Sequence, residues 1–126
     1  MPVSDVVDTA NRLIVTTCWG VVTYSEVIEH QNRLRGNPDF SPEYSQIIDA
    51  TGVTSVQFSS DEAQILVRRL PFKSGSYRAL AASSPAVFGM ARMLQTLREL
   101  AGGEECVAVF ADLSSAVKWL DEKRRI

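Results

Sequence analysis

The sequence is poor in the residues that form disulfides, metal sites and nucleophilic triads. Its 126 residues include two cysteines and one histidine: Cys18, Cys106 and His30. Both cysteines lie in apolar runs, LIVTTCWG and CVAVF, where a free thiol is expected to be buried as a small hydrophobe. The two cysteines and the histidine lack the paired spacing of a structural zinc site. His30 lies in EHQNR, on the expected solvent face of a helix, so no His-based nucleophilic mechanism and no catalytic residue is predicted.

Strong net charge and long apolar runs are also missing. Thirteen basic and 15 acidic side chains leave a formal charge of −2, so no overall positive field would attract nucleic acid. No apolar run approaches the roughly 18 residues of a membrane span. The first ten residues, MPVSDVVDTA, have two acids and no basic segment, so we expect no signal peptide and a cytoplasmic protein. The length predicts one domain over residues 1–126, with a polar C-terminal tail at 121–126.

What is present is an alternation of strand-like and helix-like segments. Short runs rich in β-branched or small apolar residues predict strands at 3–9, 13–19, 46–49, 77–82 and 106–110. Gly20 is expected to end the second strand, and residues 50–58 to form a turn followed by a short extended piece. The order ββαβαβαβα predicts a single α/β domain. Its mainly parallel sheet of about five strands would begin with an antiparallel hairpin and be flanked by about four helices.

Capping residues predict where these helices begin. They are Thr23 with Glu26 in a capping box, one of Ser59 to Asp61, Ser84 before Pro85, and Asp112 or Ser114. The helices are expected to end at Gly36, before Pro71 and at Gly102-Gly103.

Gly89 lies inside the helix expected from Ser84 to about Leu100, where glycine costs about 1 kcal/mol relative to alanine. We expect this glycine to allow the close approach of a neighbouring helix or strand. The alternative is that it leaves room for a ligand or a dimer partner. Phe88, Met90 and Met93 could line such a surface or could belong to the core. The edge hairpin and this Met-rich helix could each support a homodimer.

The segment IIDATGVTSVQFSSDEAQIL resembles the strand–turn–helix of STAS domains, with Asp49, Gly52, Val53, Thr54 and Ser59 in register. With WGVVTYSEVIEHQNRL and VFADLSSAVKWL, nearly the whole chain resembles the SpoIIAA-like branch of that superfamily. The branch is described as related also to CRAL-TRIO lipid carriers. The resemblance implies the α/β fold predicted above and a non-enzymatic regulatory or binding module without a cofactor.

In STAS domains the phosphorylation switch resembles Asp-Ser-Ser-Gly at a helix N-terminus, and Ser59 matches the phosphorylated position. The matching residues here are Gln57, Phe58, Ser59 and Ser60, so the flanking Asp and Gly are absent. A phosphate on Ser59 would be tolerated at the positive helix end. The alternative is that Ser59 or Ser60 only caps the helix, and the acidic pair that follows would repel a second anion.

Trp19, at the probable carboxyl edge of the sheet where ligands of open α/β sheets tend to bind, could approach Tyr24, Asp49 and Ser59. Asp49 could instead accept hydrogen bonds from the turn amides of Thr51 and Gly52.

Four basic residues surround the turn at Pro71: Arg68, Arg69, Lys73 and Arg78. They could form a patch for anionic lipid heads, a phosphate or an acidic protein, or could be solvated separately.

Two functions follow from these observations. The first is binding of a protein partner, or of a small apolar or anionic ligand, near the Asp49–Ser59 edge. The alternative is a lipid-like or membrane-surface carrier resembling CRAL-TRIO domains, which needs an apolar cavity on the order of several hundred Å³. Neither function involves nucleic acid or a metal. The candidate binding residues are Trp19, Tyr24, Asp49, Ser59, Ser60, Arg68, Lys73 and Phe88.

Overall fold

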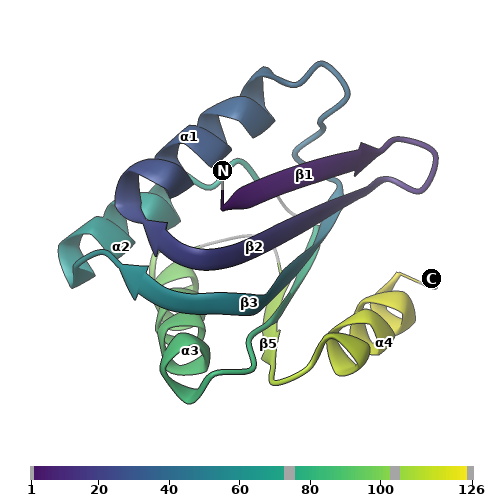
Figure 1. Cartoon of the computed structure of the whole chain (residues 1–126). Helices are drawn as coiled ribbons and strands as arrows, with labels where there is room; N and C mark the ends of the chain where they lie inside the picture. Colours follow the sequence, from purple (N-terminus) through teal and green to yellow (C-terminus); the bar gives the residue numbers. More distant parts are fainter. Residues whose placement is uncertain (1, 73–75, 103–105, 125–126) are drawn as a thin grey trace.

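The computed structural model describes residues 2–72, 76–102 and 106–124. These residues form one five-stranded mixed sheet and four helices (Figure 1). Their order is β1 (Val3–Asp8), β2 (Leu13–Thr23), α1 (Tyr24–Gly36), β3 (Ser45–Gln57), α2 (Ser60–Arg68), β4 (Tyr77–Ala81), α3 (Pro85–Leu100), β5 (Cys106–Phe110) and α4 (Leu113–Lys123). The strands lie side by side in chain order, with β1 antiparallel to β2 and all later pairs parallel. This confirms the predicted α/β class, element order and N-terminal hairpin.

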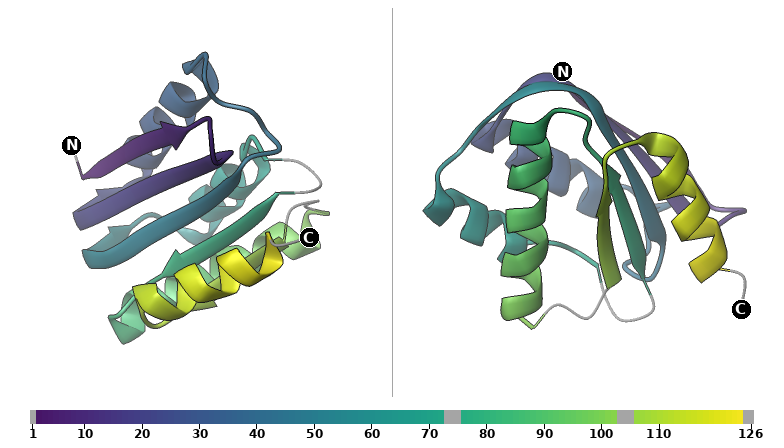
Figure 2. Two further views of the ribbon diagram at one scale, coloured as in Figure 1. Left: turned by 90° about the vertical axis from the view of Figure 1, so that its right-hand side faces the viewer. Right: turned by 90° about the horizontal axis from the view of Figure 1, so that it is seen from below.

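The helices cover the two faces of the sheet unequally (Figure 2). Helices α1, α2 and α3 lie on one face, and α4 lies alone on the other. The alternation of side chains along a strand explains how one sheet serves both layers. In β3, Ala50 packs in a cluster with Val87 of α3, whereas Ile47 packs with Ala116 and Leu120 of α4.

Strand β2 continues past the glycine that was expected to end it. Gly20 has a φ of +67°, a left-handed conformation that glycine adopts without steric cost. The register against β3 shifts between Gly20 and Val21, so the strand passes through an irregularity and runs on to Thr23. The expected end of the strand at Gly20 is wrong because a bulge absorbs the glycine.

Strand β3 is also longer than predicted. Residues 50–58 were expected to form a turn followed by a short extended piece, but Ser45–Gln57 is a single strand. A second register shift lies between Thr17 and Trp19 of β2, and directly after it Trp19 pairs with Gly52. The turn-forming residues Thr51 and Gly52 therefore lie in an irregular stretch of the strand, where β2 provides the backbone partners.

The helix starts agree with the predicted caps. Thr23 and Glu26 form a capping box at α1, and Ser59 and Glu62 form another at α2. Ser84 precedes Pro85 at the start of α3. Asp112 caps α4 by accepting a hydrogen bond from the Ser115 amide at 2.7 Å.

The helix ends agree less closely with the pattern. Residues 121–123 of the predicted polar tail form the last turn of α4. After α3, Gly102 has a φ of +78°, and Gly103 lies outside the described residues. Among the described helices, none combines the length and apolar character needed to cross a membrane.

Two interpretations of single residues are wrong. A Cβ added at Gly89 would meet no atom of another element within 4 Å, and the residue is exposed. No neighbouring element therefore approaches it. Cys106 is exposed at the start of the edge strand β5, whereas Cys18 is half-buried.

Candidate functional site

A pocket of about 190 Å³ lies between the sheet and the layer formed by α1, α2 and α3. Its walls are mainly aliphatic side chains from both layers, including Val22, Ile48 and Leu80 from the strands and Leu66, Met90 and Leu94 from the helices. A smaller set of polar side chains lines the same pocket, from β2, β3, β4, α1 and α3. The site is therefore an apolar chamber with a defined polar part.

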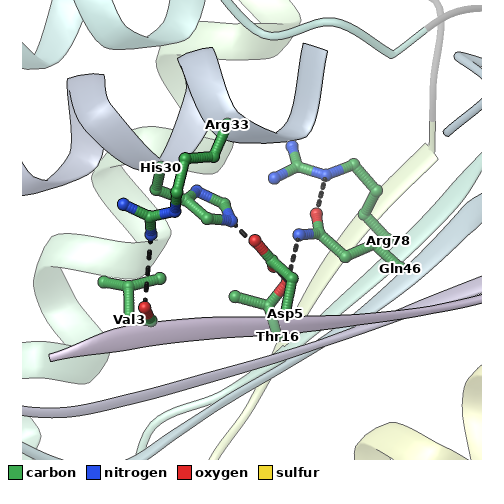
Figure 3. Close-up of polar contacts among 7 residues, drawn as sticks. All are labelled: Val3, Asp5, Thr16, His30, Arg33, Gln46 and Arg78. Atoms are coloured by element: carbon green, nitrogen blue, oxygen red, sulfur yellow. Dashed lines mark hydrogen bonds and ion pairs between the residues drawn. The ribbon is translucent and has the colours of Figure 1, made fainter. Parts of the chain in front are cut away.

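The polar part contains a chain of hydrogen bonds that crosses four neighbouring strands (Figure 3). The Nε of Arg78 in β4 donates to Oε1 of Gln46 in β3 at 2.9 Å. The Nε2 of Gln46 donates to Oγ1 of Thr16 in β2 at 2.8 Å, and that hydroxyl donates to Oδ1 of Asp5 in β1 at 2.5 Å. From α1, Nε2 of His30 lies 2.8 Å from the same Asp5 oxygen.

The two ends of this chain fix its direction. A guanidinium can only donate hydrogen bonds and a carboxylate can only accept them, so the Gln46 amide and the Thr16 hydroxyl each have one orientation. Gln46 and Thr16 are both 1% exposed. Such buried polar groups are tolerated because each has a partner. The chain thus connects a buried cation to a nearly buried carboxylate through two neutral groups.

Arg78 is held from a second side as well. Its guanidinium carbon lies 4.7 Å from the centre of the Phe72 ring, a cation–π distance. The residue is 8% exposed, so the prediction that Arg78 belongs to a surface charge cluster is wrong. The alternation within YRALA turns this one polar side chain toward the three-helix layer.

His30 is also more buried than predicted. Its side chain is 13% exposed and that of Asp5 is 12% exposed, so His30 does not lie on the solvent face. The helical spacing explains this, because position 30 lies three residues after Val27 and four before Leu34, both of which line the pocket. That spacing was the available signal, and the polar neighbours of His30 in the sequence obscured it.

The surroundings of Asp5 favour its charged form. Burial alone would raise the pKa of Asp5, but the hydrogen bond and charge of His30 oppose this, aided by the Thr16 hydroxyl and the charge of Arg33. Together they hold the pKa of Asp5 below its ordinary value.

Cys18 lines the pocket but does not offer a reactive thiolate. Burial raises its pKa to about 12, and the charges of Asp5 and Asp49 act in the same direction. A thiol with this pKa stays protonated at neutral pH, and protonated thiols are poor nucleophiles and metal ligands. Among the described residues, no group of three or more His, Cys, Asp or Glu side chains could hold a metal ion.

Basic side chains outnumber acidic ones among the described residues that line the pocket. Arg78, Arg98 and His30 line it, and none of its described lining residues is an Asp or Glu. Arg98 reaches from α3 to the backbone, with Nη1 donating to the Val67 carbonyl at 3.0 Å and Nη2 to the Phe72 carbonyl at 3.4 Å. This arginine ties α3 to the end of α2 and the segment that follows.

Of the residues selected from the sequence, those that the structure describes do not line this pocket. Trp19 is 43% exposed. Asp49 accepts hydrogen bonds from the backbone N–H and Oγ1 of Thr51, at 3.1 and 2.6 Å. The prediction that Asp49 accepts hydrogen bonds from the amides of Thr51 and Gly52 is therefore confirmed for Thr51. Thr51 lies within strand β3 and not in a turn. Phe88 packs against the cluster around Val87.

Two of the selected residues, Tyr24 and Ser59, lie at the same edge of the sheet, whereas Asp49 lies far from that edge. Thr23 pairs with Gln57, so Tyr24 and Ser59 follow neighbouring strand ends. Asp49 lies eight residues before Gln57 in the same strand, about 25 Å away at the usual strand rise. The continuous β3 therefore separates Asp49 from Ser59.

Ser59 caps α2, accepting a hydrogen bond from the Glu62 amide at 3.1 Å, as the capping alternative predicts. Ser60 and Arg68, the first and last residues of α2, are both exposed.

The three described basic residues around Pro71 lie in different surroundings. Arg68 is exposed and Arg78 is buried. Arg69 donates from Nη2 to Oδ1 of Asn32 at 2.8 Å and from Nε to Oε1 of Gln31 at 3.3 Å, which ties α1 to the end of α2. Lys73 lies outside the described residues. The predicted patch is therefore divided between the surface, a helix contact and the interior.

Comparisons with known proteins bear on the fold. No protein-family model matches the sequence, and no match was found among curated proteins. Among solved structures, the chain is similar to an uncharacterized protein of the DUF3478 family from Shewanella loihica PV-4, described as having a SpoIIAA-like fold. The TM-score is 0.60 at 14% sequence identity, covering 94% of this chain and 93% of that chain. This confirms the SpoIIAA-like fold and does not show a relation to CRAL-TRIO carriers.

Proposed function

We propose that this SpoIIAA-like domain is a binding module that holds a small, mainly apolar molecule between its sheet and α1–α3. The observation that carries the proposal is the pocket of about 190 Å³ with predominantly apolar walls. Protein interiors are normally close-packed, with few voids larger than a water molecule. An engineered apolar cavity of roughly 150 Å³ is sufficient to bind benzene. The pocket therefore suits an aromatic ring or a short alkyl chain.

Its position relates this proposal to both functions predicted from the sequence. The pocket lies beneath the helices, as a carrier would require, and Ala50, Val53, Val56 and Phe58 of the Asp49–Ser59 stretch line it. Its volume is below the several hundred Å³ that a carrier of large lipids needs, which favours a small ligand. The protonated thiol of Cys18 supports binding over nucleophilic chemistry at this pocket.

Filling the pocket with a side chain tests the proposal. Ala91 of α3 is 5% exposed and lines the pocket, whereas Ala86 of the same helix is exposed and serves as the matched control. We expect toluene, titrated by NMR, to bind the wild type and Ala86→Phe with equal affinity. In Ala91→Phe the new ring occupies the pocket, so toluene affinity should fall at least tenfold.

Thermal unfolding of each variant shows whether it is folded, and Ala91→Leu provides a smaller replacement if the phenyl ring is not accommodated. The proposal fails if the wild type does not bind toluene. It also fails if a folded Ala91→Phe or Ala91→Leu protein binds toluene as tightly as the wild type does.

A further inference from the structure

We infer that the pocket selects uncharged molecules without hydrogen-bonding groups, and that its polar side chains hold the fold together and do not bind the ligand. This inference rests on the proposed function, because it names the chemical class of the ligand for the same pocket: a hydrocarbon or a similar neutral compound. Its evidence is the way in which each polar side chain at the pocket is already bonded to the protein.

The hydrogen-bond chain between Arg78 and Asp5 engages both of its neutral members on two sides. The Oε1 of Gln46 accepts from Nε of Arg78, and its Nε2 donates to the Thr16 hydroxyl. That hydroxyl donates in turn to Asp5, and both neutral residues are 1% exposed. A polar ligand group would have to displace one of these partners, and such an exchange of hydrogen bonds contributes little net free energy.

Two further glutamines that line the pocket join a helix to a neighbouring element. Gln31 of α1 donates from Nε2 to the Leu66 carbonyl of α2 at 3.0 Å, and its Oε1 accepts from Nε of Arg69 at 3.3 Å. Gln95 of α3 donates from Nε2 to the Val107 carbonyl of β5 at 2.8 Å. These amides therefore have a structural role in the walls of the pocket.

The basic side chains at the pocket are engaged with the protein as well. Arg98 donates to two backbone carbonyls, and Arg78 is bonded through Nε and lies against the Phe72 ring. His30 faces the Asp5 carboxylate. Within the described part of the chain, every buried side-chain nitrogen and oxygen has a hydrogen-bond partner. An ionised ligand would therefore lose its hydration without meeting a group that still needs a partner, which is costly.

The rest of the wall offers apolar contact, from side chains such as Val22, Leu66 and Leu94. Desolvation then decides between ligands of the same shape, because a neutral ring gains from leaving water whereas a hydroxyl or a charge loses by it. Since basic side chains predominate among the described lining residues, a cation should be excluded most strongly.

A set of probes with one ring tests the inference at neutral pH. Toluene, phenol, benzoate and benzylamine are similar in size and differ in polarity and charge, benzylamine being a cation under these conditions. Their affinities are measured by NMR titration. We expect the wild type to bind toluene about tenfold or more tightly than phenol, and to bind benzoate and benzylamine more weakly than phenol.

A substitution in the pocket wall tests the reason for this order. Leu94 of α3 lines the pocket, so Leu94→Gln adds an amide that can bond the phenol hydroxyl, and the preference for toluene over phenol should fall. Leu100 of the same helix is 79% exposed, and Leu100→Gln should retain the full preference. Thermal unfolding shows whether each variant is folded.

If Leu94→Gln does not fold, the order of the four probes on the wild type still decides the question. Binding of phenol, benzoate or benzylamine as tightly as toluene would overturn the inference and leave the proposed function intact. A folded Leu94→Gln protein with the wild-type preference would also contradict the inference. Failure of the wild type to bind any of the four probes would overturn both the inference and the proposed function.

Discussion

Asp5 and Arg78 show how two opposite charges are accommodated in this core without touching each other. Each has a neutral hydrogen-bonding neighbour on the next strand, Thr16 for Asp5 and Gln46 for Arg78, and these two neighbours are bonded to each other. Burying a charge without a partner is costly. In the part of the chain that the structure describes, no buried side-chain nitrogen or oxygen lacks a hydrogen-bond partner. The prediction at the scale of single residues therefore concerns Asp5, one end of this chain of hydrogen bonds.

Replacing Asp5 by Asn should make stability depend on pH in a definite direction. The pKa of Asp5 is lowered in the folded protein, so its charged form adds stability above the ordinary pKa of 3.8. That contribution is lost as the pH falls through the lower folded value. We expect Asp5→Asn to lower the free energy of unfolding by about 1–2 kcal/mol at pH 7. The difference from the wild type should shrink between about pH 4 and pH 2.

Urea unfolding across this pH range measures the effect. The exposed loop residue Asp39 provides the control, and Asp39→Asn should change the unfolding free energy by less than about 0.5 kcal/mol. A difference between Asp5→Asn and the wild type that stayed constant from pH 7 to pH 2 would contradict the assigned role of the Asp5 charge.

The elements follow local sequence signals closely, and the exceptions involve glycine. Gly20 was expected to end β2 but lies in a bulge within it. Gly89 was expected to mark a close contact but faces open space on α3. The backbone conformation at Gly20, where φ is +67°, requires glycine. The packing around Gly89 does not require it. A pair of alanine substitutions distinguishes these two situations.

Gly89→Ala should stabilise the protein. Alanine is favoured over glycine inside a helix by about 1 kcal/mol, and the added Cβ would meet nothing within 4 Å outside its own helix. For a domain of this size the melting temperature should rise by roughly 3–5 °C. Gly20→Ala should act in the opposite direction, because an alanine held in the left-handed region costs roughly 1–2 kcal/mol. Calorimetric melting of both variants decides, and a lower melting temperature for Gly89→Ala would be inconsistent with an open site.

The sequence predicts the elements better than it predicts the pocket. The capping box at Thr23, the N-cap candidates from Ser59 to Asp61 and the short apolar runs are local signals, and they located the helix starts and most strands. The polar part of the pocket contains Gln46, Arg78 and His30, whose separation in the chain conceals their proximity. Their only common signal is a polar residue at a position that the strand or helix period turns inward. Which helices cover that face depends on long-range packing.

At the scale of the whole molecule, the unequal cover of the sheet gives the protein two different halves. Helices α1, α2 and α3 enclose the pocket on one face. On the other face α4 packs directly on β3, β4 and β5, with Trp119 beside Tyr77 and Phe110. A molecule in the pocket would therefore contact one helical layer only.

Amide hydrogen exchange should report this asymmetry. At about 100 times its dissociation constant, a ligand of the folded state adds roughly 2.7 kcal/mol to the unfolding free energy. With toluene present, we expect amides that exchange through local opening of α1, α2 and α3 to slow. Amides that exchange through local opening of α4 should keep their rates. Slower local exchange confined to α4 would place the ligand on the other face and contradict the proposed pocket.

The single direction of the hydrogen bonds from Arg78 to Asp5 has a consequence for how this sequence can vary. Because Gln46 must accept from one side and donate to the other, and Thr16 must do the same, neither can be replaced independently by a residue with only one of these capacities. Positions 5, 16, 46 and 78 are dispersed along the chain, yet we expect them to co-vary among homologous sequences. Homologous sequences that lose the arginine should also lose the aspartate or replace the pair between them.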